Sequence, residues 1–246
     1  MLITELNKKA LDVLNNTFGY SSYRYEQEKI INSVLSGNHT LAIMPTGAGK
    51  SLCYQIPAII SSKKTVIISP LISLMDDQVS ALKECGVQAA KIHSDMTYDE
   101  RSSSWNNFKN GKEKIIYLSP EKIMSEDFLN QLKTLDIGLF VIDEIHCVSK
   151  WGHNFRPDYN QLSQLKSLFP NSNIIGFTAT ADQTTRLDIL EKIFNKNVNV
   201  FVSSLDRPNL SLSITQKTNW KSQLLEYLRD RKSQSGIIYC LSKKKT

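Results

Sequence analysis

A glycine-rich turn near the start of the chain limits its fold more than any other feature. Residues 40–44 form a short apolar run typical of a strand, residues 51–60 are typical of a helix, and residues 45–51 (PTGAGKS) join them. Gly47 and Gly49 allow the backbone to wrap so that successive N–H groups point at one anion, and the N-terminus of the helix adds partial positive charge. The sequence therefore predicts a loop that grips the phosphates of a nucleotide.

The same loop supplies side chains suited to triphosphate chemistry. Lys50 would reach the β- and γ-phosphates as a catalytic cation, and the Ser51 hydroxyl would bind Mg²⁺. The residues expected to contact the nucleotide phosphates are Thr46, Gly47, Ala48, Gly49, Lys50 and Ser51. Met44 stands where the strict pattern has glycine, and the alternative is an ordinary glycine-rich connection between a strand and a helix.

Short β-branched runs alternate with helical stretches along the chain. The expected strands are residues 40–44, 65–69, 89–93, 114–118, 139–143, 174–178 and 198–202. The clearest helical periodicities lie in residues 72–85, 158–168 and 183–194. Several strands are apolar on successive residues, as strands covered on both faces must be. We therefore expect an α/β fold with a parallel sheet and helices on both faces.

A polar stretch at residues 203–209 is the best domain boundary, because it ends in Arg207-Pro208-Asn209, which would break a helix or a strand. After it the pattern predicts a strand at residues 210–214, a helix at 220–231 and a strand at 236–240. We expect residues 1–206 to form one complete α/β lobe. Residues 207–246 would be a hinge and the incomplete start of a second lobe.

An acidic pair follows another apolar strand. Residues 137–142 deliver Asp143 and Glu144 at the carboxyl end of that strand, the edge at which parallel sheets bind ligands. Asp143 would hold Mg²⁺, and Glu144 would orient and deprotonate the attacking water. The alternative is a pair of solvated loop charges. His146 is equally consistent with a coupling residue and with a hydrogen-bonded core histidine.

Composition is compatible with this interpretation without proving it. The chain is 41% hydrophobic and 22% charged, which is typical of a globular protein. Its net charge of +6 favours a polyanionic partner such as nucleic acid, or simply a solvated lysine surface. The four cysteines lack the short spacing of zinc sites. No signal peptide and no membrane-spanning run are evident, so we expect a cytoplasmic protein without a membrane partner, at the nucleoid if the source is bacterial.

From about Leu11 to its end, the sequence resembles the RecQ-type helicases of superfamily two. Residues 143–146 (DEIH) look like the acidic box of that family, with Ile145 where alanine is usual. Residues 18–27 are similar to its adenine-recognition segment. The resemblance implies that Tyr20 and Arg24 sandwich the base while Gln27 bonds its edge. The alternative for these three residues is an amphipathic helix start with a surface arginine.

Other segments resemble the parts of the family that contact DNA. Residues 69–78 and 118–121 look like segments that contact the nucleic-acid backbone, although each is also compatible with an ordinary connection from a strand to a helix. Residues 147–159 resemble the aromatic-rich loop, and residues 178–180 (TAT) resemble the motif that links hydrolysis to strand separation. The residues that the resemblance implies in DNA binding or coupling are Trp151, His153, Phe155, Arg156, Thr178 and Thr180.

The aromatic spacing within residues 147–159 has an alternative explanation. Trp151, Phe155 and Tyr159 recur every four residues, which would also suit one buried helical stripe. Gly152 and Pro157 argue against a continuous helix through all three, so a loop on which bases stack is favoured.

Taken together, the resemblance implies a RecA-like motor that uses ATP and Mg²⁺ to separate DNA strands, moving 3′ to 5′. Its partners would be single-stranded DNA and duplex junctions, together with proteins of DNA repair or replication. The arginine finger of the family lies further on than Thr246, so we expect this chain alone to bind ATP and hydrolyse it poorly. The alternatives are a truncated, non-catalytic module that binds ATP or DNA, and an unrelated phosphate-loop ATPase such as a transporter or a kinase.

Overall fold

The computed structural model describes residues 3–151, 155–203 and 210–242. Internal contacts divide the chain into two compact units, Met1–Leu205 and Asp206–Thr246. The first unit contains a parallel sheet and almost all of the buried core, and the second contains one helix.

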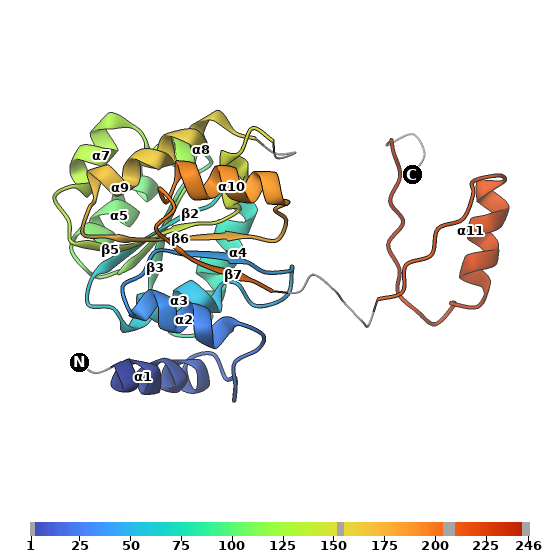
Figure 1. Cartoon of the computed structure of the whole chain (residues 1–246), viewed down its shortest axis with the longest axis horizontal. Helices are drawn as coiled ribbons and strands as arrows, with labels where there is room; N and C mark the ends of the chain where they lie inside the picture. Colours follow the sequence, from blue (N-terminus) through green and yellow to red (C-terminus); the bar gives the residue numbers. More distant parts are fainter. Residues whose placement is uncertain (1–2, 152–154, 204–209, 243–246) are drawn as a thin grey trace. The chain divides into compact units, whose positions relative to one another are not determined.

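Seven parallel strands form the sheet of the first unit, in the order β3-β4-β2-β5-β6-β1-β7 (Figure 1). Their bounds are β1 Thr40–Ile43, β2 Lys64–Ile68, β3 Ala89–Ile92, β4 Ile115–Leu118, β5 Ile137–Ile142, β6 Asn173–Thr178 and β7 Asn199–Val202. All seven strands expected from the sequence are confirmed, within two residues at each end. β1 to β6 are buried along nearly their whole length, as consecutive apolar residues predict for strands with two covered faces.

Helices cover both faces of this sheet (Figure 1). One face packs against α1 Ile3–Asn16, α2 Gln27–Leu35, α3 Leu52–Ile60 and α4 Ile72–Glu84. The other packs against α5 Tyr98–Lys109, α6 Pro120–Ile123, α7 Glu126–Leu132, η1 Ile145–Val148, α8 Pro157–Gln161, η2 Leu162–Gln164, α9 Leu165–Leu168 and α10 Gln183–Lys192. The predicted α/β fold is therefore confirmed.

The helix expected over residues 158–168 was wrong as a single element. The structure breaks it into α8, the 3₁₀ turn η2 and α9. The Ser163 hydroxyl donates to the carbonyl oxygen of Asn160 at 2.8 Å, and the Ser167 hydroxyl donates to that of Gln164 at 2.8 Å. Serine side chains that bond nearby carbonyls compete with regular helix hydrogen bonds, which accounts for the interruption.

The second unit holds one regular element among its described residues, helix α11 (Trp220–Arg229). The expected helix is thus confirmed, with Asn219 accepting a hydrogen bond from the Ser222 N–H as its N-terminal cap. The strands expected at residues 210–214 and 236–240 were wrong, because neither segment forms a ladder in the structure. A strand needs a paired neighbour, and residues 210–242 provide none.

Candidate functional site

The phosphate loop lies between β1 and α3, at the carboxyl edge of the sheet. Gly47 and Gly49 have φ angles of 82° and 74°, which are left-handed values that favour glycine. Thr46 in this loop is exposed to solvent, whereas Ala48 is buried against the rest of the unit. Met44, which replaces the glycine of the strict pattern, is buried, and its N–H donates to the Thr178 carbonyl oxygen at 3.0 Å.

The acidic pair follows β5 at the same edge and faces the loop. The Lys50 ammonium nitrogen lies 3.8 Å from Glu144 Oε1. The structure thus brings together the two residues predicted to be catalytic, although 94 positions separate them in the sequence (144 minus 50). Glu144 has a left-handed backbone, with φ 47° and ψ 45°. A non-glycine residue rarely adopts this conformation except where the surrounding structure imposes it, often at functional sites.

Asp143 is half-buried and directly follows β5, beside the end of β2. Its N–H donates to the Ile68 carbonyl oxygen at 2.9 Å, and its Oδ1 accepts a hydrogen bond from the Glu144 N–H at 3.0 Å. Burial, and next the charge of Glu144, raise the pKa of Asp143 to about 6. Its carboxylate is therefore costly to keep ionised without a cation.

The donor set around Asp143 fits Mg²⁺. The Asp143 carboxylate and the Ser51 hydroxyl offer oxygen atoms, which Mg²⁺ prefers. The described residues contain no group of three or more His, Cys, Asp or Glu side chains arranged to hold a metal.

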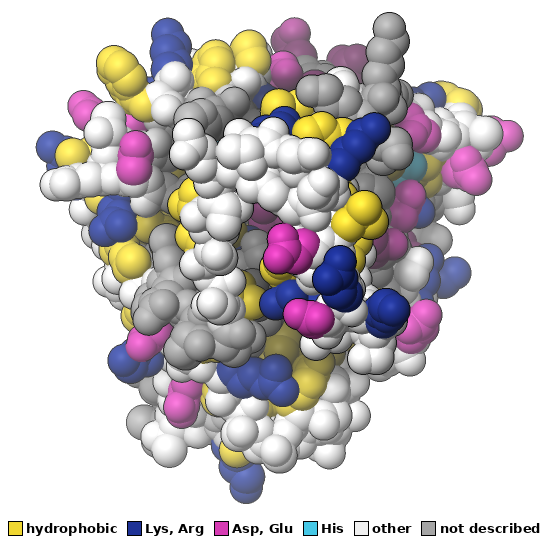
Figure 2. All heavy atoms as spheres, turned by 90° about the vertical axis from the view of Figure 1, so that its right-hand side faces the viewer, with side chains coloured by type: hydrophobic (Ala, Val, Ile, Leu, Met, Phe, Trp, Pro, Cys, Tyr) yellow, Lys and Arg dark blue, Asp and Glu magenta, His cyan; other side chains and the backbone are white. Residues whose placement is uncertain are grey.

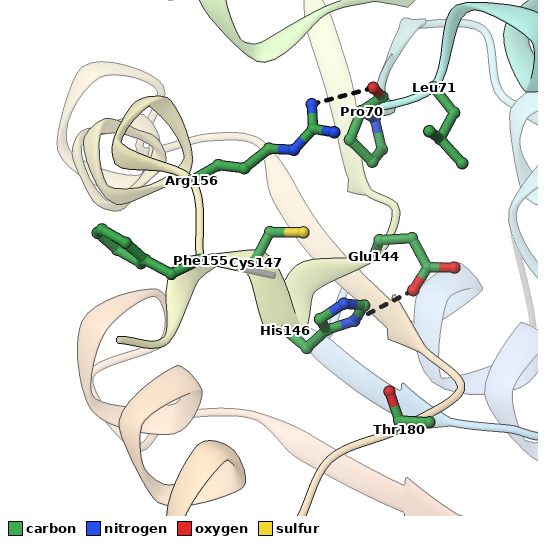
Figure 3. A pocket seen from close by; sticks show the side chains of 8 residues that line it. All are labelled: Pro70, Leu71, Glu144, His146, Cys147, Phe155, Arg156 and Thr180. Atoms are coloured by element: carbon green, nitrogen blue, oxygen red, sulfur yellow. Dashed lines mark hydrogen bonds and ion pairs between the residues drawn. The ribbon is translucent and has the colours of Figure 1, made fainter. Parts of the chain in front are cut away.

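His146 connects the acidic pair to the end of β6. Its Nδ1 lies 3.1 Å from Glu144 Oε2 and 2.8 Å from Thr178 Oγ1 (Figure 3 shows the contact with Glu144). Hydrogen bonds with the side chains of Cys147 and Glu144 raise the pKa of His146 to about 9. The hydrogen bond with His146 in turn lowers the pKa of Glu144. The alternative of a buried, hydrogen-bonded histidine is therefore confirmed, and a coupling role for His146 stays a prediction.

Residues 178–180 form a compact turn after β6. Thr178 Oγ1 donates to the Thr180 carbonyl oxygen at 3.0 Å and accepts a hydrogen bond from the Thr180 N–H at 3.1 Å. Thr178 is buried, whereas Thr180 is exposed. The Thr178 hydroxyl therefore contacts both the exposed end of this turn and His146.

The predicted adenine residues gather beside the phosphate loop, around a cavity of about 100 Å³. The Arg24 guanidinium carbon lies 5.8 Å from the centre of the Tyr20 ring. Two stacking contacts of about 3.5 Å each would need a gap of about 7 Å, so a base between these side chains would require them to separate slightly. The Gln27 amide donates to the carbonyl oxygens of Ala48 and Gly49 at 3.0 and 3.2 Å, which ties this segment to the loop.

The aromatic loop contributes to a cavity of about 640 Å³ (Figure 3). Phe155 and Arg156 line it together with Glu144, His146 and Thr180.

Residues 151, 155 and 156 lie outside regular helix, and α8 begins at Pro157, so the alternative of one continuous helical stripe was wrong. Trp151 is 72% exposed, as a stacking platform requires. His153 lies outside the described residues.

Two contacts in this region were not foreseen from the sequence. The Arg156 guanidinium donates to the Pro70 carbonyl oxygen at 3.1 Å, which joins the aromatic loop to residues 69–78 (Figure 3). The buried Tyr159 hydroxyl donates to the Asp143 carbonyl oxygen at 2.9 Å. The only advance signal for Tyr159 was its place in the aromatic spacing.

On the face drawn in Figure 2, lysine and arginine side chains lie among aspartate and glutamate side chains. Among the described helices, none has both the length and the apolar character needed to cross a membrane.

Comparison with known proteins adds the family context. The profile described as DEAD/DEAH box helicase matches residues 24–188. The chain is 45% identical over 240 residues to "ATP-dependent DNA helicase RecQ" of Pasteurella multocida (strain Pm70), covering 98% of this chain and 38% of that protein. It is 39% identical over 243 residues to "Probable ATP-dependent DNA helicase RecS" of Bacillus subtilis (strain 168), covering 96% of this chain and 48% of the relative. The chain thus spans less than half the length of these curated relatives.

Solved structures support the fold. The crystal structure of the DUF1998 helicase MrfA bound to DNA and AMPPNP matches with a TM-score of 0.65 at 17% identity, over 92% of this chain and 34% of that one. A hypothetical ATP-dependent RNA helicase from Sulfolobus tokodaii matches with a TM-score of 0.60 at 20% identity, over 80% of this chain and 56% of that one. At such identities the likeness shows a shared fold and nothing about substrate.

Proposed function

The chain belongs to the DEAD/DEAH box helicase family, and on that premise we propose that its first unit is the ATP-binding motor lobe of a RecQ-like DNA helicase. The observation that carries this proposal is the 3.8 Å approach of Lys50 to Glu144. It brings an ammonium group and a carboxylate together at one edge of the sheet, where ligands of parallel α/β proteins bind. The proposed cofactors are ATP and Mg²⁺.

Each residue of this site has a defined part in the proposed reaction. Lys50 neutralises the β- and γ-phosphates, and the loop N–H groups hold them in place. Glu144, whose pKa His146 lowers, is ionised near neutral pH and accepts a hydrogen bond from the attacking water. Mg²⁺, when held by Ser51 and Asp143, supplies positive charge that stabilises the leaving phosphate oxygens. Tyr20, Arg24 and Gln27 orient the adenine.

We propose that DNA is the second substrate and that it contacts the aromatic loop. Trp151 offers an exposed ring on which a base can stack, and Arg156 connects that loop to residues 69–78. The route from DNA to the reaction then runs through Arg156 and the pocket that it shares with Glu144 and His146. Single-stranded DNA and duplex junctions are the proposed substrates, and translocation from 3′ to 5′ is part of the proposal.

The preference for DNA over RNA rests on relatives named as DNA helicases. A competition experiment tests it directly, with labelled single-stranded DNA displaced by DNA or RNA of the same sequence. We expect the DNA competitor to be more effective, and equal competition would contradict a DNA-specific function. A cytoplasmic or nucleoid location and partners from DNA repair or replication belong to the same proposal.

The catalytic assignment is tested with Glu144→Gln, which keeps the shape of the side chain but removes its basicity. In the 246-residue chain, the variant should bind Mg²⁺–ATP with about the affinity of the parent. When the same residues are joined to a second lobe of RecQ type, DNA-stimulated hydrolysis should fall by about 10²–10⁴-fold, the usual contribution of a positioned base.

Glu84→Gln is the matched control, since Glu84 is an exposed residue at the end of α4. It should leave both binding and hydrolysis unchanged. Hydrolysis by Glu144→Gln at the rate of the parent would remove Glu144 as the base. If the parent binds ATP but never hydrolyses it in the two-lobe form, a non-catalytic binding module becomes the better description.

A further inference from the structure

Helix α3, which begins directly after the phosphate loop, carries a buried amide at Gln55. The side chain is 5% exposed, although glutamine is usually a surface residue. Its Nε2 donates to Gln78 Oε1 at 3.0 Å and lies 3.4 Å from the Tyr117 hydroxyl. A buried amide in a core of aliphatic and aromatic side chains is stable only if these hydrogen bonds are made.

One partner of Gln55 lies within a candidate DNA segment, and the other lies next to a second such segment. Gln78 lies on α4 and is the last residue of the segment 69–78, which begins at the carboxyl end of β2. Tyr117 lies on β4, one residue before the segment 118–121. One amide therefore contacts the segment 69–78 at Gln78 and, through Tyr117, the residue that directly precedes the segment 118–121.

The backbone of Gln55 connects it to the phosphate loop. Gln55 lies one helical turn after Ser51, and its N–H donates to the Ser51 carbonyl oxygen at 2.9 Å. The start of α3 thus links the phosphate loop to the Gln55 side chain, which contacts Gln78 and Tyr117.

We propose that Gln55 is a positioning residue that couples nucleotide binding at the phosphate loop to nucleic-acid binding at residues 69–78 and 118–121. This inference rests on the proposed function. A shift of α3 when the phosphates are bound moves the Gln55 amide, and α4 and the end of β4 must follow or lose a buried hydrogen bond. Leaving the buried Gln55 amide unpaired costs free energy. The arrangement of α3 and α4 that keeps this bond is therefore shared by the two sites, so each ligand changes the affinity of the other.

The test measures binding of a fluorescent, non-hydrolysable ATP analogue with Mg²⁺ to the 246-residue chain, with and without single-stranded DNA, and DNA binding with and without the analogue. In the parent, each ligand should change the dissociation constant of the other by about fivefold or more, and by the same factor in both directions.

Gln55→Leu and Gln78→Leu should each bring that factor to within about twofold of unity, and in Gln55→Leu each ligand bound alone should keep its affinity within about threefold. The double variant should lose no more coupling than either single variant, because all three remove the same hydrogen bond.

Ser33→Ala is the matched control. Ser33, on α2, is also buried and hydrogen-bonded, with the Thr40 hydroxyl at 2.8 Å and the Asn199 side chain at 3.0 Å. These partners lie on β1 and β7, at the end of the strand order away from β4. It should reduce stability and leave the coupling factor as in the parent. Unchanged coupling in Gln55→Leu, or equal loss in Ser33→Ala, would overturn the inference.

Two results in the parent separate this inference from the proposed function. A parent that binds both ligands without mutual effect overturns the coupling role of Gln55 and leaves the proposed function intact. A parent that binds neither ligand overturns the proposed function, and the inference with it.

Discussion

Tyr159 places one hydroxyl at the point where β5 ends and the acidic pair begins. Its ring is fully buried, and its hydroxyl donates to the Asp143 carbonyl oxygen at 2.9 Å. The residue therefore does two things that the sequence pattern could not separate. It fills the core under α8, and it holds the backbone from which both carboxylates project.

Replacing Tyr159 with phenylalanine should separate these two roles. Tyr159→Phe keeps the packing and removes one hydrogen bond, so the free energy of unfolding should fall by about 1 kcal/mol. The measurement is urea unfolding, with Tyr98→Phe as control because Tyr98 is 77% exposed. A loss no larger than in the control would mean that the Tyr159 hydroxyl contributes nothing to holding Asp143.

The titration of Asp143 predicts a pH dependence for magnesium binding. Its pKa in the metal-free chain is raised to about 6, chiefly by burial. Mg²⁺ binds the carboxylate, so protons compete with the metal below that pKa and not above it. The affinity for Mg²⁺ in the presence of the ATP analogue should therefore fall as pH drops through about 6, approaching tenfold per pH unit below it.

The nucleotide phosphates also bind protons, so Asp143→Asn is the necessary comparison. This variant should bind Mg²⁺ more weakly throughout and show a shallower dependence on pH. If the two proteins give parallel curves, the titrating group is not Asp143.

At the level of elements, η1 approaches β6 unusually closely. Ile145 stands where the resemblance stated from the sequence implies alanine, and its buried side chain lies directly over Gly176. A Cβ atom added to Gly176 would collide with the Ile145 side chain. The larger residue in η1 is thus accommodated by the absence of a side chain in β6.

This packing predicts a compensating pair of substitutions. Gly176→Ala should destabilise the chain by about 1–3 kcal/mol through overpacking. Ile145→Ala should cost about 2–5 kcal/mol through the cavity that it leaves. In the double variant the added methyl group occupies part of that cavity, so its loss of stability should be smaller than the sum of the two. Additive losses in urea unfolding would contradict the direct contact.

The elements also show why some expectations succeeded and others failed. Strands such as β2 and β5 could be predicted because consecutive apolar residues need two covered faces, whatever surrounds them. The helix at residues 158–168 could not be placed correctly, because its break depends on where Ser163 and Ser167 find carbonyl partners. Hydrophobic periodicity predicts which face of a segment is buried, but it does not predict where serine hydroxyls compete with the backbone hydrogen bonds of a helix.

For the candidate site, the sequence allowed the side chains to be predicted, but most of their hydrogen-bond partners could not be. The approach of Lys50 to Glu144 followed from the rule that parallel strands present their carboxyl ends at one edge. The bond from Arg156 to Pro70 spans 86 positions and depends on how two loops meet in space. The Gln55 amide had no advance signal at all, because nothing in a helical pattern marks one glutamine as buried.

At the scale of the whole molecule, the first unit is a complete parallel sheet with both faces covered, and the second contains a helix with no buried residue. The apolar residues Trp220, Leu225 and Tyr227 on that helix are exposed. That residues 207–246 begin a second RecA-like lobe stays a prediction. In related nucleotide hydrolases an arginine from a neighbouring element contributes about 10³–10⁵-fold to the rate.

The central claim is that Lys50 and Glu144 form an ATPase site whose turnover depends on DNA and on a second lobe. The rate of ATP hydrolysis tests it most directly, measured with and without single-stranded DNA on the 246-residue chain and on the same residues joined to a second lobe. The 246 residues alone should bind ATP but hydrolyse it slowly in both conditions, and the two-lobe form should be stimulated strongly by DNA. Rapid, DNA-stimulated hydrolysis by the single chain, or a two-lobe form indifferent to DNA, would contradict the account.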